Sequence, residues 1–177
     1  MRFVDGNLFL TRTPGRRCRT PSNRSVLNTI TLHELIHSDL LHTAFCHAFF
    51  IAQDEFFRYF DFHRADVPIY ISRDFYQDVE GMQAANHDPS DKRLSQPKFS
   101  IASQKAIEHY ARTYGTNFKA LYPHMMAGCS HSKVLVLEYA SFLRIVVTSA
   151  NFMDCDTEMG DNVRSNRNPS SRTVVIY

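Results

Sequence analysis

The sequence has no C-x-x-C pair, no apolar run long enough to span a membrane and no apolar segment behind Met1. The missing run excludes a membrane-spanning helix, which needs about twenty apolar residues in succession. The polar start predicts no secretory signal peptide. The cysteines are scattered, which is typical of a protein from a reducing, intracellular compartment; they are Cys18, Cys46, Cys129 and Cys155.

Excess charge of either sign is also missing. A formal net charge of +2 does not by itself favour a nucleic-acid partner. The exception is the segment 12–24, which holds five arginines and no acidic residue. This composition favours a solvated loop, with an arm that contacts phosphates as the alternative.

The 177 residues suffice for one domain, residues 1–177, with a substantial core. Strand-like apolar runs alternate with helical spacing, which predicts an α/β fold: a layered sheet flanked by helices, with strands covered on both faces. Phe45, Phe49 and Phe50 are expected in the core. The stretches 76–98 and 159–172 lack periodicity and are predicted to be flexible loops. The expected strands are 8–12, 40–51, 67–71, 117–122, 134–137, 143–147 and 173–177, and the expected helices start at Thr31, cover 54–60 and cover 103–114.

His131 and Lys133 form an H-x-K triplet in front of the apolar run 134–137. Residues two apart on a strand point to the same face, so the imidazole and the ammonium are predicted to lie together. Asn151 follows the next apolar run, and a short turn would bring it to the same end of the sheet. A histidine that attacks phosphorus or moves a proton, a lysine that neutralises charge and an asparagine that donates N–H suit a tetrahedral phosphate.

These motifs resemble the phospholipase D superfamily, whose signature is H-x-K followed by a small residue, Ser, any residue and Asn. The segments 130–139 (SHSKVLVLEY) and 143–151 (LRIVVTSAN) are similar to the first catalytic motif of the tyrosyl-DNA phosphodiesterase family, and 8–12 (LFLTR) to its entry strand. The resemblance covers nearly the whole chain. It implies a phospholipase D-like fold, of which this chain would be the first half, with the second half absent.

The resemblance implies a phosphodiester hydrolase that removes 3′-linked peptide adducts from DNA during repair in the nucleus. The reaction would pass through a phosphohistidine. His131 would be the nucleophile, Lys133 and Asn151 would hold the phosphate, and Ser130 and Ser149 would contact the substrate. No metal or other cofactor is expected, because lysines supply the positive charge.

Enzymes of this family use two H-x-K motifs, and the second histidine protonates the leaving group. This sequence contains one such triplet. Three explanations stay open: an incomplete chain without activity, a homodimer in which His131 serves both roles across a twofold axis, or a catalytically dead module that binds nucleic acid. The sequence also departs from its relatives at 127–129, where they tend to carry an aromatic that can stack on DNA.

A zinc hydrolase is the remaining alternative. His33, Glu34 and His37 match the H-E-x-x-H pattern of zinc peptidases. No third ligand follows at the usual spacing, so we predict that His33 and His37 do not share a zinc ion. His42 and His47 are expected to be core or edge histidines of a central strand.

Overall fold

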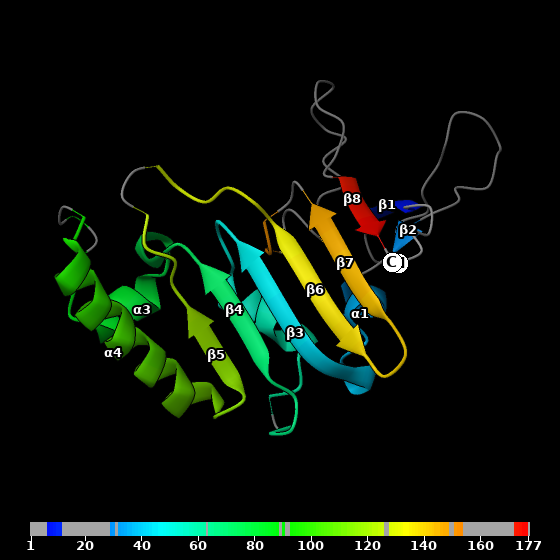
Figure 1. Ribbon diagram of the computed structural model, residues 1–177, viewed down its shortest axis with the longest axis horizontal. Coiled ribbons are helices and arrows are strands. Elements are labelled where there is room, and N and C mark those ends of the chain that lie inside the picture. Colours follow the sequence, from blue (N-terminus) through cyan, green and yellow to red (C-terminus); the bar gives the residue numbers. More distant parts are fainter. Residues whose placement is uncertain are drawn as a thin grey trace.

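The computed structural model describes residues 7–11, 29–30, 32–62, 64–88, 90, 93–125, 128–148, 151–153 and 172–176 (Figure 1). Strands and helices alternate through most of this range. In chain order the elements are β1 (Asn7–Thr11), β2 (Thr29–Ile30), α1 (Leu32–Ile36), η1 (Ser38–Leu40), β3 (Leu41–Ala48), α2 (Gln53–Phe56), η2 (Phe57–Tyr59), β4 (Ile69–Arg73), η3 (Phe75–Gln77), α3 (Val79–Ala84), α4 (Gln96–Tyr114), β5 (Phe118–Leu121), β6 (Val134–Tyr139), β7 (Leu143–Thr148) and β8 (Arg172–Ile176).

The strands form one eight-stranded sheet in the order β2-β1-β8-β7-β6-β3-β4-β5. β3, β4 and β5 run parallel, and β6 lies antiparallel between β3 and β7. The carboxyl ends of β3, β4, β5 and β7 therefore meet the amino end of β6 at one edge of the sheet (Figure 1). In parallel-strand folds this is the edge at which ligands bind.

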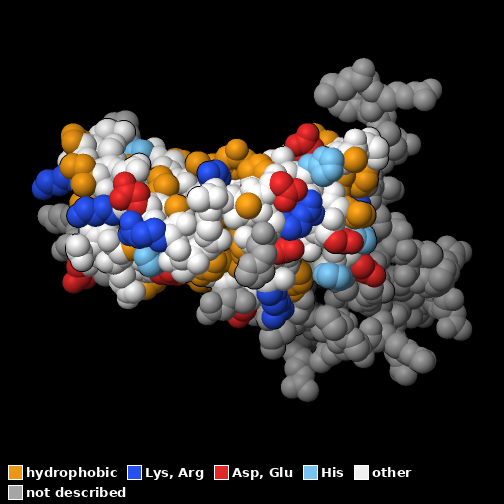
Figure 2. Space-filling view, turned by 90° about the horizontal axis from the view of Figure 1, so that it is seen from below, with side chains coloured by type: hydrophobic (Ala, Val, Ile, Leu, Met, Phe, Trp, Pro, Cys, Tyr) orange, Lys and Arg blue, Asp and Glu red, His pale blue; other side chains and the backbone are white. Residues whose placement is uncertain are grey.

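The helices cover one face of the sheet (Figure 1). Cys46, Leu135 and Val146 point to the covered face and are buried. On the opposite face, Leu143 and Val147 are 46% and 44% exposed. The expectation that both faces are covered is therefore wrong for the described residues. Figure 2 shows apolar side chains along the upper margin of the molecule, where this open face lies.

Most of the predicted elements are confirmed within a few residues. The helix predicted to end before Gly115 does so, and Gly115 adopts a positive φ of 101°. That helix begins earlier than expected, at Gln96, where a proline in its first turn favours a helix start. The predicted carboxyl-terminal strand is β8, whereas Thr31 and 159–171 lie outside the described residues.

The prediction of a flexible loop over 76–98 is wrong where that segment forms helices. It contains α3 and the start of α4, and Asp78 caps α3 by accepting a hydrogen bond from the Gly81 amide at 3.1 Å. Met82 and Phe99 are buried in a second, smaller cluster. A six-residue helix is too short to show a helical period, so the sequence pattern did not predict it.

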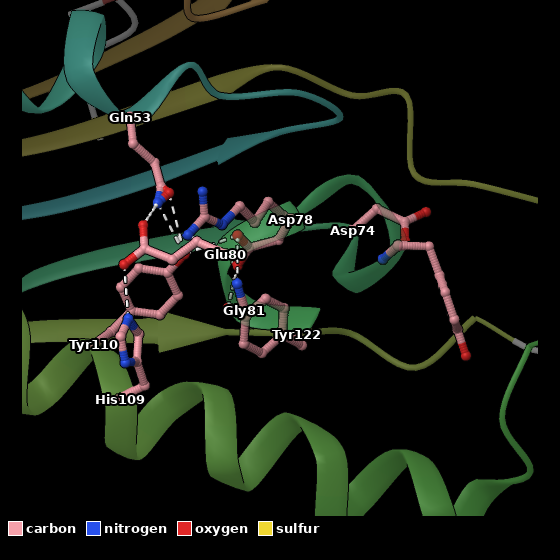
Figure 3. Close-up of polar contacts among 10 residues, drawn as sticks. Gln53, Asp74, Asp78, Glu80, Gly81, His109, Tyr110 and Tyr122 are labelled. Carbon is pink, nitrogen blue, oxygen red and sulfur yellow. Dashed lines mark hydrogen bonds and ion pairs between the residues drawn. The ribbon is translucent and has the colours of Figure 1, made fainter. Parts of the chain in front are cut away.

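A buried polar network holds this part of the chain to the sheet (Figure 3). Arg73, at the carboxyl end of β4, forms an ion pair with Asp78 at 2.9 Å. The Asp78 carboxylate also accepts hydrogen bonds from the hydroxyls of Tyr110 and Tyr122. Burial raises the pKa of both tyrosines, so each hydroxyl stays protonated and donates.

Removal of the Asp78 charge should be costly. Asp78→Asn leaves the Arg73 guanidinium buried without a counter-ion, and we expect a loss of about 3–5 kcal/mol in the free energy of unfolding, measured by urea denaturation. Asp66→Asn, which breaks an exposed pair with Arg64, is the control and should cost about 0–1 kcal/mol. Equal losses in the two variants would contradict this account.

Candidate active site

The H-x-K triplet lies at the sheet edge where five strand ends meet. His131 and Lys133 lie in a segment without regular secondary structure directly before β6, which starts at Val134 as the sequence predicted. The Thr148 amide donates to the Lys133 carbonyl at 3.1 Å, which attaches this segment to the end of β7. His131 is exposed, whereas Lys133 is only 3% exposed.

The two side chains are in contact. The Lys133 ammonium lies 2.7 Å from Nδ1 of His131 and 3.4 Å from its Nε2, and it donates to the His131 carbonyl at 2.9 Å. An ammonium has donors and no acceptor, so the nearer ring nitrogen must present its lone pair. The neutral imidazole then carries its proton on Nε2. The shorter of the two contacts therefore favours the Nε2-protonated tautomer of the exposed imidazole.

The turn that follows β3 forms one wall of the site. The Phe49 ring lies 5.2 Å from the His131 ring, centroid to centroid, and limits its rotation. The next amide, that of Phe50, donates to Oδ1 of Asn151 at 3.3 Å. This bond identifies the carboxamide oxygen and leaves the NH₂ group as the donor end of Asn151. Phe49 and Phe50 are half-buried site residues and not the core residues that the sequence predicted.

Asn151 is fixed by the residue after it. Phe152 is buried, and its ring stacks on Phe56 with centroids 4.5 Å apart. The Ala52 amide donates to the Phe152 carbonyl at 2.9 Å, so 151–153 runs alongside 50–52. The segments that carry His131 and Asn151 thus both contact the turn at 49–52. The catalytic roles of His131, Lys133 and Asn151 stay predictions.

Of the two predicted substrate contacts, the structure describes Ser130. Ser149 lies outside the described residues. Ser130 is half-buried, and its hydroxyl is hydrogen-bonded to Nε2 of His47 at 2.7 Å. The sequence missed this contact, because His47 is 83 positions away from Ser130 and was assigned a core or edge role.

The two histidines of the H-E-x-x-H pattern do not lie on one helix. α1 ends at Ile36, and His37 adopts a left-handed conformation with φ 43° outside the helix. His33 and His37 are exposed, and the described part of the chain brings no three metal-binding side chains together. The geometry that zinc peptidases need from two histidines on one helix face is therefore missing here.

The geometry at the sheet edge agrees with a sequence-family match. The family model described as tyrosyl-DNA phosphodiesterase matches residues 8–167. The chain belongs to the tyrosyl-DNA phosphodiesterase family. No curated protein sequence matches it. Within the described residues, no helix is long and apolar enough to cross a membrane.

Solved structures of a family member are similar to this chain. The crystal structure of yeast tyrosyl-DNA phosphodiesterase matches with 16% identity and a TM-score of 0.49, over 84% of this chain and 28% of that one. A histidine-to-alanine variant of the yeast protein matches with 15% identity and a TM-score of 0.48, over 83% and 28%. This tyrosyl-DNA phosphodiesterase-family chain thus spans 28% of the length of these structures.

The contact between Lys133 and His131 predicts a specific tautomer. At a pH above the range in which histidine titrates, nitrogen-15 NMR of His131 should show the proton on Nε2. Lys133→Met removes the donor at Nδ1 and should weaken that preference toward the intrinsic preference of a free imidazole, whereas Lys105→Met, on the exposed side of α4, should not. A wild-type ring protonated on Nδ1 would contradict the described contact.

Proposed function

We propose that this chain supplies the nucleophilic part of a phosphodiesterase that removes 3′-linked peptide adducts from DNA. The supporting observation is the contact between an exposed imidazole and a buried ammonium, 2.7 Å apart, in a chain of this family. A DNA substrate also suggests a role in DNA repair and a nuclear location. Both belong to the proposal.

The geometry suggests how the first step would run. A phosphodiester anion that enters the site competes with Nδ1 of His131 for the Lys133 ammonium. The imidazole is then released from its hydrogen bond and can turn a lone pair toward phosphorus, with Phe49 limiting the available orientations. Asn151 would donate N–H to a phosphate oxygen and help to stabilise the charge that develops there.

The covalent chemistry follows from these roles. A His131 nitrogen forms a bond to phosphorus while the bond from phosphorus to the tyrosyl oxygen breaks, and that oxygen leaves with its electron pair. Water then attacks phosphorus and gives up a proton, the bond to His131 breaks with its electron pair returning to the ring nitrogen, and DNA with a 3′-phosphate is released; the departed tyrosyl oxygen takes up a proton from solvent. No metal is required by this scheme, because Lys133 neutralises charge.

A proton donor for the leaving oxygen has to be added to this site. The sequence contains one H-x-K triplet, and in this proposal His131 is occupied as the nucleophile. Without a general acid the rate would fall by about two to four orders of magnitude. We propose that a second H-x-K, from another copy of the chain or from a complementary half, completes the site. The open sheet face supports such pairing, because Leu143 and Val147 leave apolar surface in water.

The covalent step is testable with a 3′-phosphotyrosyl oligonucleotide. Alkaline quenching and mass spectrometry should detect a phosphoramidate adduct on His131 that forms slowly in the wild-type chain. His131→Ala should form none, and Lys133→Ala should slow formation by about 10²–10³-fold through loss of charge stabilisation. His33→Ala, an exposed histidine outside the site, is the control and should match the wild type.

Two other results of this experiment would contradict the proposal. An adduct in His131→Ala would exclude His131 as the nucleophile. A wild-type chain that binds the oligonucleotide without any adduct would favour the second candidate, a catalytically dead module that binds nucleic acid. The one observation in favour of that candidate is the single H-x-K triplet.

Pairing of two copies predicts dominant inhibition. If each site uses His131 from both chains of a twofold dimer, an equal amount of His131→Ala chain should reduce turnover per wild-type chain to about half. The same mass of serum albumin is the control. Unchanged turnover per wild-type chain would show that the second proton donor does not come from another copy.

A further inference from the structure

His47 connects two neighbouring elements to the segment that carries the H-x-K triplet. Its side chain comes from the carboxyl end of β3, and both ring nitrogens are hydrogen-bonded. Nδ1 is bonded to the Ser72 hydroxyl of β4 at 2.9 Å, and Nε2 to the Ser130 hydroxyl at 2.7 Å. Ser72 is buried and is the strand partner of His47, so this side of the imidazole is firmly held.

Residues 128–133, which His47 contacts through Ser130, form no helix or strand. Residues 128–133 precede β6, and Gly128 adopts a positive φ of 75°. The bond between Thr148 and Lys133 and the bond between His47 and Ser130 join this segment to neighbouring strands. The second contact is made by the residue directly before His131.

We propose that His47 is a positioning residue for His131. Its ring is held by β3 and β4 and is hydrogen-bonded to Ser130. This bond restrains the backbone from which the His131 side chain projects. This inference rests on the proposed function for its catalytic consequence. Its structural part, the restraint of 130–133 by His47, stands on the two hydrogen bonds.

The charge state of His47 suits this role. Partial burial lowers the pKa of His47 below its ordinary value of 6.5, so the ring is neutral at pH 7. A neutral imidazole has one donor and one acceptor, and each serine hydroxyl can take either part. Both contacts therefore form without a second positive charge near the buried Lys133 ammonium, where a like charge would be unfavourable.

The restraint can be measured without any activity. Amide hydrogen exchange over Ser130–Lys133 should become about tenfold faster in His47→Gln and in Ser130→Ala, the factor expected for one lost hydrogen bond. Ser130→Thr keeps the hydroxyl and should restore wild-type exchange. The double variant should exceed neither single variant, because both remove the same contact. His42→Gln, an exposed histidine near the start of β3, is the control.

Activity then tests the catalytic part separately. With the 3′-phosphotyrosyl oligonucleotide, His47→Gln and Ser130→Ala should lower kcat and leave KM nearly unchanged, and Ser130→Thr should recover kcat. Unchanged exchange in both His47→Gln and Ser130→Ala would overturn the inference, whether or not the chain is active. Altered exchange in a chain that forms no adduct on His131 would support the restraint and count against the proposed function instead. If His47→Gln does not fold, Ser130→Ala decides alone, because Ser130 lies outside the strands.

Discussion

The buried ammonium of Lys133 is the constraint on which the site depends. A cation that is 3% exposed has to be compensated by nearby acceptors, and the His131 carbonyl and ring nitrogen supply two of them. This need fixes the backbone of the triplet and the tautomer of the imidazole together. It also prepares a response to substrate, because an anion gives the ammonium a better partner than the ring nitrogen. Without substrate, the Lys133 ammonium occupies the lone pair of the His131 ring nitrogen. An incoming phosphate that binds the ammonium makes this lone pair available for attack.

The surrounding fold supports this arrangement through a few contacts at one sheet edge. β6 and β7 bring the triplet and the Asn151 segment together, and the turn after β3 contacts both through Phe49 and Phe50. At the carboxyl end of β4, the buried pair of Arg73 and Asp78 holds α3 and α4 to the sheet. Ser72, the residue directly before Arg73, is bonded to His47, so this pair and the site are neighbours along the same strand ends.

The sequence predicted the features that local pattern determines. The two apolar runs around the triplet are β6 and β7, and the spacing of His131 and Lys133 placed their side chains together. It missed the features that depend on distant partners. His47 bonds to Ser72 and Ser130, which are 25 and 83 positions away, so no local pattern marks it. The apolar strands predicted cover on both faces, because a strand pattern shows that a face is apolar but not what covers it. Short helices such as α3 give too few residues for a period to show.

The central claim is that phosphate and His131 compete for the same ammonium, and a titration with inorganic phosphate tests it most directly. The nitrogen-15 signals of the Lys133 ammonium and the His131 ring should shift together, with one dissociation constant, while the signal of Lys105 on exposed α4 stays unchanged. We expect this joint shift, because one phosphate replaces one ring nitrogen as the partner of the ammonium. A Lys133 signal that does not respond to phosphate, or a His131 signal that stays unchanged while Lys133 shifts, would contradict it.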